Sequence, residues 1–165
     1  MRALLGRIAV WWALLGGVLL FAIVFVTVTN VGGFALDRVA RLFGGTVYGL
    51  PGYEDFVRLA ISAAALMLLP YCQLVRGHVA VDLFADMAPR RVQKVLDTFS
   101  LAAMGVLALF LAYWMTIGMV ETRHDGALSR VLSWPEWPFY LPGIVSLLLW
   151  AAVAAVQLFE RDRDG

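Results

Sequence analysis

The residues best suited to chemistry lie together between positions 76 and 91. His78, Asp82 and Asp86 recur every four residues, so a helix would place one imidazole and two carboxylates along the same face. Such groups can share a cation, but a structural zinc site takes four ligands and is richer in cysteine and histidine. The second histidine, His124, is separated from this group by a long apolar segment. We therefore expect a hydrogen-bonded, ion-paired cap here and no metal site.

An amphipathic helix is predicted to position these groups. Val79, Leu83 and Met87 form an apolar row beside the polar one, which is typical of a helix lying in a membrane interface. Gly77 permits a sharp bend before this helix, and Pro89 ends it. We expect the interfacial helix to run from about 78 to 88.

Long apolar segments flank this helix on both sides. Hydrophobic residues make up 62% of the 165 positions and charged residues 15%, whereas soluble domains have about 45–50% and about 25%. Mean hydropathy is +0.82. A bilayer core of about 30 Å requires about 20 apolar residues per helix. We predict an all-α integral membrane protein with one membrane domain over residues 1–165 and four transmembrane helices, at about 8–31, 55–75, 94–120 and 137–159.

Glycine and proline set the expected loops. Glycine recurs from Gly32 to Gly52, so we expect no continuous helix there, and a short separate helix is predicted from Phe34 to Phe43. Pro135 and Pro138 suit the entry to the last span, because proline is tolerated in a first turn where its missing N–H would be unpaired anyway.

The predicted spans contain few polar side chains. Asn30 and Gln73 fall near span ends, where we expect water to satisfy them. Transporters that couple a solute to ions usually carry ionisable residues within spans, or paired broken helices. The sequence has neither feature, which favours an accessory role, and we expect no catalytic or cofactor-binding residue. A net charge of +1 excludes an electrostatic nucleic-acid binder.

Small residues recur at four-residue spacing on every predicted span. Such seams let membrane helices approach closely, because lipid provides no hydrophobic drive between helices. The predicted seams are Ala9, Ala13 and Gly17 on the first span, Ala60 and Ala64 on the second, Ala108 and Ala112 on the third, and Ala151 and Ala155 on the fourth.

The distribution of basic residues predicts the orientation. With both termini in the cytoplasm, eight Lys and Arg residues lie inside and five lie outside. The inner residues cluster at helix ends, where the positive-inside rule has most force. We therefore predict an N-in, C-in topology.

Three features in combination resemble the small, DctQ-like permease subunit of tripartite ATP-independent periplasmic (TRAP) transporters, along nearly the whole chain. An acidic residue, Glu54, opens the second span, and an Arg/Gly-x-His-hydrophobic-x-Val-Asp stretch follows that span. The last span begins with a Pro-x-Trp-x-x-Tyr-x-x-Pro-like pattern in which one gap is shortened. The second feature is matched by Arg76, Gly77, His78, Val79, Val81 and Asp82, and the third by Pro135, Trp137, Tyr140, Pro142 and Gly143.

The resemblance implies a division of labour between three components. In this family a large membrane subunit holds the substrate and sodium sites and moves, the small subunit braces its static scaffold, and a periplasmic binding protein delivers an organic acid. We expect this chain to be the small subunit in a bacterial inner membrane, with the large subunit, the binding protein and lipids as partners. Sodium would bind in the large subunit, which we expect to be a separate polypeptide because this chain ends in a charged tail at Gly165.

Two sets of residues are then expected to contact partners. The inner loop and the span ends would anchor the scaffold, and charged residues of the outer loops would meet the binding protein. The scaffold set comprises Glu54, Arg76, His78, Asp82, Arg90, Arg91, Trp137 and Tyr140. The docking set comprises Asp37, Arg38, Arg41, Arg123, Asp125 and Arg130.

Two alternatives from other classes stay open. A stand-alone small four-helix transporter would move a solute when reconstituted without partners. A membrane-anchor subunit of a redox complex would bind a haem or a quinone, although a predicted span separates the two histidines.

Overall fold

The computed structural model describes residues 2–75 and 90–163, and all structural statements below refer to these residues. Four of its helices are long and apolar enough to cross a membrane, as the sequence predicts. The predicted interfacial helix at 78–88 lies outside the described residues. In chain order, the elements are α1 (Arg2–Leu42), α2 (Tyr53–Leu74), α4 (Arg90–His124), the short 3-10 helix η1 (Trp137–Phe139) and α5 (Tyr140–Arg163).

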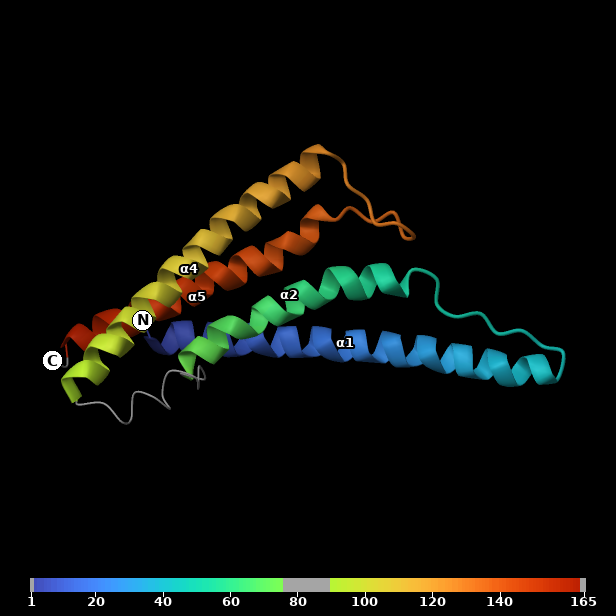
Figure 1. The fold of residues 1–165 in the computed structure, drawn as a ribbon, viewed down its shortest axis with the longest axis horizontal. Helices are drawn as coiled ribbons and strands as arrows, with labels where there is room; N and C mark the ends of the chain where they lie inside the picture. The colour runs from blue at the N-terminus through green and yellow to red at the C-terminus, as the bar shows by residue number, and fades with distance from the viewer. Residues whose placement is uncertain (1, 76–89, 164–165) are drawn as a thin grey trace.

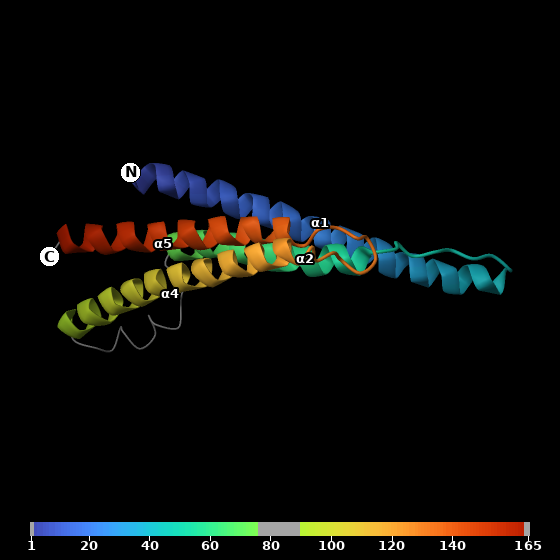
Figure 2. The same ribbon diagram turned by 90° about the horizontal axis from the view of Figure 1, so that it is seen from above.

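The helices form two antiparallel pairs (Figure 1). α1 packs along α2, α4 packs along α5, and contacts between α2 and α5 join the pairs. The start of α1 and the end of α5 lie at one end of the helices, called here the terminal end. The return loop (residues 43–52) and the hairpin (residues 125–136) lie at the other, called the loop end. Seen from above, α1 diverges from α5 toward its N-terminus (Figure 2).

α1 continues unbroken through Gly32 and Gly33 to Leu42, so the predicted break and the separate helix at 34–43 are wrong. A helix in lipid satisfies its own backbone hydrogen bonds, and glycine is therefore tolerated inside it. A Cβ atom on Gly33 would lie 3.6 Å from the Cα atom of Gly49 in the return loop. These glycines thus allow the return loop to lie close to α1, and the chain turns only beyond Leu42.

Small residues make the closest contacts between the helices. A Cβ atom on Gly16 would lie 2.8 Å from the Cβ atom of Met67, so α1 and α2 cross closely at that point. The predicted seams are wrong at Gly17, which faces open space, and at Ala155, which is exposed. They are confirmed at the buried residues Ala9, Ala60, Ala64, Ala108, Ala112 and Ala151.

Candidate functional site

Two junctions of buried polar side chains lie at opposite ends of the contact between α2 and α5. The terminal-end junction consists of Gln73, Trp150 and Gln157, all buried. The Gln73 side chain donates to Gln157 Oε1 (2.9 Å) and accepts from the Trp150 indole N–H (3.0 Å). Gln157 Nε2 in turn donates to the backbone carbonyls of Gln73 (3.1 Å) and Leu74 (3.3 Å). Because the last carbonyls of a helix have no partner within it, this amide caps α2.

The terminal-end junction corrects one expectation. Gln73 is only 3% exposed and bonds to α5 instead of water. Each of its members is neutral and satisfies another, which is the arrangement that a membrane interior requires.

The loop-end junction ties the hairpin to the first turn of α2. Asp55 is 4% exposed, and its Oδ2 atom accepts from the backbone N–H groups of Val131 (2.7 Å) and Leu132 (3.0 Å). Within the hairpin, the Ser129 N–H donates to the Trp134 carbonyl (2.8 Å), and the Trp134 N–H donates to Ser129 Oγ (3.1 Å). One carboxylate therefore fixes a loop that is already folded on itself.

Two further contacts complete the loop-end junction. Gly52, which precedes α2, has a φ of 79°, a left-handed conformation that favours glycine. A Cβ atom there would also lie 2.5 Å from Leu132 Cγ, so the hairpin packs directly on this residue. Arg58 and Glu136 form an ion pair across the same contact, and the two side chains are 52% and 23% exposed.

The return loop is held by α1. Asn30 is 1% exposed, and its Oδ1 atom accepts from the Leu50 N–H (2.9 Å), so the expectation that water satisfies this side chain is wrong for its oxygen. Its Nδ2 atom has no hydrogen-bond partner among the described residues. Asp37 Oδ1 accepts from the Val47 N–H (3.0 Å), while Oδ2 accepts from Arg41 Nε (2.8 Å). Asp37 and Arg41 thus hold the loop against the helix.

The predicted scaffold set is only partly described. Arg76, His78 and Asp82 lie outside the described residues, and Arg90 and Arg91 open α4 with side chains that are not described. Glu54 is exposed and accepts from the Tyr53 hydroxyl (3.3 Å).

The other members of the scaffold set lie where α4 meets α5. The Tyr140 and Thr122 hydroxyls are 3.4 Å apart. The Arg123 guanidinium lies 5.1 Å from the centre of the Trp137 ring, a distance at which a cation attracts an aromatic face. The structure therefore joins Trp137 of the scaffold set to Arg123 of the docking set.

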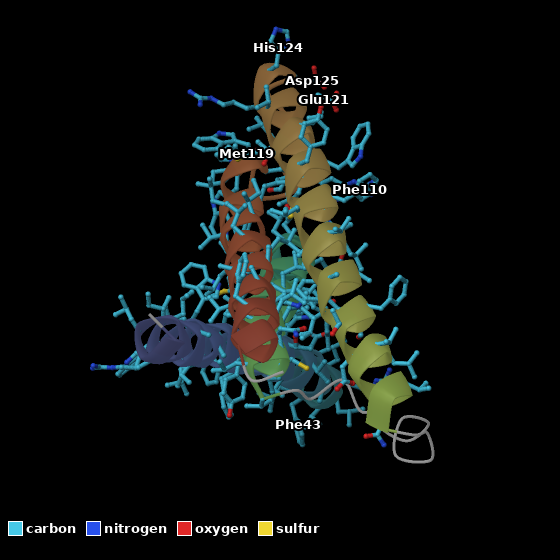
Figure 3. All side chains as sticks on the ribbon, turned by 90° about the vertical axis from the view of Figure 1, so that its left-hand side faces the viewer. Phe43, Phe110, Met119, Glu121, His124 and Asp125 are labelled. Atoms are coloured by element: carbon cyan, nitrogen blue, oxygen red, sulfur yellow. The ribbon has the colours of Figure 1, made fainter. Side chains whose placement is uncertain are left out.

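The rest of the docking set divides between two surfaces. Asp37, Arg38 and Arg41 lie on the last turns of α1. Asp125 projects with Glu121 and His124 from the far end of α4 (Figure 3). Arg130 is exposed in the hairpin, where Leu128 and Val131 are 57% and 59% exposed.

Sequence reasoning missed the residues that join the elements. Asp55, Gly52 and Trp150 received no role, because their partners lie far along the chain: 76 positions separate Asp55 from Val131. The sequence signal for the terminal-end junction is that Gln73 and Gln157 are among the few polar residues of the apolar spans. Among the described residues, no three His, Cys, Asp or Glu side chains could hold a metal ion.

One apolar groove lies on α4. Its volume is about 480 Å³, and Phe110 at one end of it points away from the other helices (Figure 3). Small side chains form its middle and aromatic rings its ends. The lining residues are Phe99, Ala102, Ala103, Val106, Leu107 and Phe110.

Comparison with known proteins gives one match. The sequence model of a family described as "Tripartite ATP-independent periplasmic transporters, DctQ component" matches residues 31–164. The match begins within α1 and extends through α5. No curated protein and no solved structure matches the chain.

Proposed function

The chain belongs to the DctQ component family of TRAP transporters, and on that premise we propose that it braces the large transporting subunit without binding substrate itself. The family consists of transporter components and not of enzymes, so a redox-enzyme anchor is excluded. The chain is a multi-pass membrane protein of a family that resides in the bacterial inner membrane, and its transporter has other components. We propose that the transporter takes up an organic acid and that sodium, bound in the large subunit, drives this uptake.

The proposal rests on the hydrogen bonds that polar side chains inside the helices make to one another. α4 has no charged residue from 98 to 120, and α5 has none from 140 to 159. The Trp12 indole donates to Ser146 Oγ (2.8 Å), whose hydroxyl donates to the Pro142 carbonyl (2.6 Å). Together with the terminal-end junction, these bonds direct the interior polar groups toward one another. Such bonds rigidify a bundle and leave few groups to bind an ion or a carboxylate.

The groove on α4 is the proposed contact with the large subunit. Small residues such as Ala102 and Ala103 let another helix approach closely, and the flanking phenylalanines can pack around it. Ala103→Leu should fill the groove and reduce the amount of large subunit that co-purifies. Ala155→Leu, on an exposed position of α5, is the matched control and should leave co-purification unchanged. Equal recovery of the large subunit with both variants would show that the contact lies elsewhere on the chain.

The hairpin is the proposed contact with the binding protein. It presents Arg130 beside Leu128 and Val131 on a loop that Asp55 fixes. The topology that places it in the periplasm is N-in, C-in, which stays a prediction from the basic residues. Of the docking set, Asp37 and Arg41 already hold the return loop, so we give the hairpin the greater weight.

A cross-linking experiment tests the static brace. In an otherwise cysteine-free transporter carrying Cys72→Ala, Arg58→Cys and Glu136→Cys would be joined by a short reducible linker across their contact. A static brace predicts equal uptake of labelled dicarboxylate or sialic acid before and after linking, in proteoliposomes with all three components. A loss of uptake that reduction of the linker restores would contradict it. Sodium-driven uptake by this chain alone would establish the stand-alone transporter instead.

A further inference from the structure

α1 is much longer than a membrane crossing requires. Its 41 residues span about 60 Å at 1.5 Å per residue, whereas the hydrocarbon core is about 30 Å thick. α2 has 22 residues, about 33 Å, and so fits the core. Figures 1 and 2 both show α1 continuing past the first turn of α2 and past the hairpin. The last turns of α1 therefore extend beyond the part of the helix that α2 and the hairpin accompany, and their surroundings must be identified separately.

The exposed side chains of α1 identify that environment. Residues at spacings of three, four or seven share one face of a helix, and one such row extends without a charge from Val10 to Leu42, about 48 Å. We call this row the α1 stripe. Every member is exposed, from 38% at Val10 to 81% at Leu42. The stripe comprises Val10, Leu14, Phe21, Val24, Val28, Val31, Ala35, Val39 and Leu42.

The polar groups of the last turns lie away from the stripe. Asp37 and Arg41 bond to each other, and Asp37 bonds to the return loop, so that loop covers the opposite face. The exposed Arg38 lies at the border of the stripe, where a long side chain can extend its charge to lipid phosphates. This distribution of charge is that of a helix segment at a bilayer surface.

We infer that α1 crosses the bilayer obliquely and that its last turns, Phe34 to Leu42, lie in the headgroup layer of the leaflet at the loop end. This is the outer leaflet in the predicted topology. A stripe of about 48 Å fits a layer of about 40 Å at a tilt of about 34°, toward the upper end of the range for membrane helices. The lipid surface is thus the partner of Val39 and Leu42, and the return loop lies on the water side of this segment.

Spin labels at single cysteines test the inference in the assembled transporter. The transporter would carry Cys72→Ala and be placed in nanodiscs of phosphatidylethanolamine and phosphatidylglycerol. Labels would be attached to the stripe at Leu14→Cys, Ala35→Cys, Val39→Cys and Leu42→Cys, and to Thr46→Cys in the return loop as the matched water-facing control. Ala35, Val39, Leu42 and Thr46 are all exposed, so these substitutions leave the packing intact.

The expected result is that relaxation by oxygen falls and relaxation by a water-soluble nickel chelate rises from Ala35 to Leu42, with nickel access at every stripe label below that at Thr46. The depth of the label in the bilayer, obtained from the ratio of the two relaxation effects, should change by about 1.2 Å per residue from Leu14→Cys to Leu42→Cys. A helix at the usual tilt of about 20° would give about 1.4 Å per residue. Nickel access at Val39 and Leu42 equal to that at Thr46 would place the segment in water and overturn the inference. Exclusion of both reagents would also overturn it, because another subunit would then cover the stripe.

Discussion

The two junctions, at opposite ends of the contact between α2 and α5, hold their elements together by different kinds of polar contact. At the terminal end, two glutamines and a tryptophan bond through neutral groups, and all three are buried. At the loop end, a carboxylate accepts backbone N–H groups and an ion pair spans the contact. The first junction sits among apolar helices and the second at the start of a span, beside loops. A buried charge must be hydrogen-bonded or paired, and the hairpin offers Asp55 two backbone N–H groups, whereas the N–H groups inside a helix are already used, so the neighbouring element decides which residue types can form the junction.

The largest expected effect comes from Gly52→Ala. The substitution combines a left-handed φ with contact of the new Cβ atom with Leu132, so we expect a loss of about 2–4 kcal/mol. Gly44→Ala is the matched control, because its φ is 78° but no atom lies within 4 Å of the added Cβ. That variant should lose only about 1 kcal/mol. Unfolding of the purified chain by SDS measures the free energy of unfolding of both variants. Equal losses of this free energy would show that the hairpin does not pack on Gly52.

Asp55→Ala should have the next largest effect, concentrated in the hairpin. Without the carboxylate, the N–H groups of Val131 and Leu132 lose their partner, and the hairpin should detach from α2. We expect tryptic cleavage after Arg130 to accelerate severalfold. Asp55→Asn retains an acceptor oxygen and should accelerate cleavage less. Equal rates of cleavage in the wild-type chain and in Asp55→Ala would show that this carboxylate does not hold the hairpin against α2.

Gln157→Leu tests the neutral junction. It removes the bonds from Gln157 to Gln73 and to the end of α2, and we expect a loss of about 1–2 kcal/mol. In a double-mutant cycle with Gln73→Leu, the coupling energy should be about 0.6–1.7 kcal/mol, the range found for hydrogen bonds between membrane helices. Additive losses in SDS titrations would mean that the two amides act independently.

The smallest effect is expected from the ion pair. Arg58 is half exposed, so Arg58→Gln and Glu136→Gln should each cost less than about 1 kcal/mol. High salt should abolish the difference from the wild-type chain, since it screens exposed charges. The terminal-end variants should be insensitive to salt, and this contrast is the sharpest comparison between the two junctions. A salt-independent loss at Arg58 would indicate that the pair is more enclosed than its exposure suggests.

Some interpretations from the sequence rested on local composition and were confirmed. Four long helices coincide with the four apolar segments, because only a helix can satisfy its backbone in lipid. The predicted break at Gly32 and Gly33 rested on rules for helices in water, where glycine weakens a helix by about 1 kcal/mol. In α1 the same glycines lie within a span and beside the return loop, so the helix continues to Leu42. The inner-loop cap of His78 and Asp82 stays a prediction outside the described residues.

The sequence by itself determined the number of spans and the family, because apolar length and short motifs are properties of neighbouring residues. Only the tertiary structure decided which polar residues meet: Gln73 with Gln157, 84 positions apart, and Asp55 with the hairpin. The packing of α2 against α5 brings these groups together, and that packing depends on side-chain shape along whole helices. The tertiary structure also decided that Asn30 and Gln73 bond to protein, since their burial follows from the neighbouring loop and helix and not from distance to a span end.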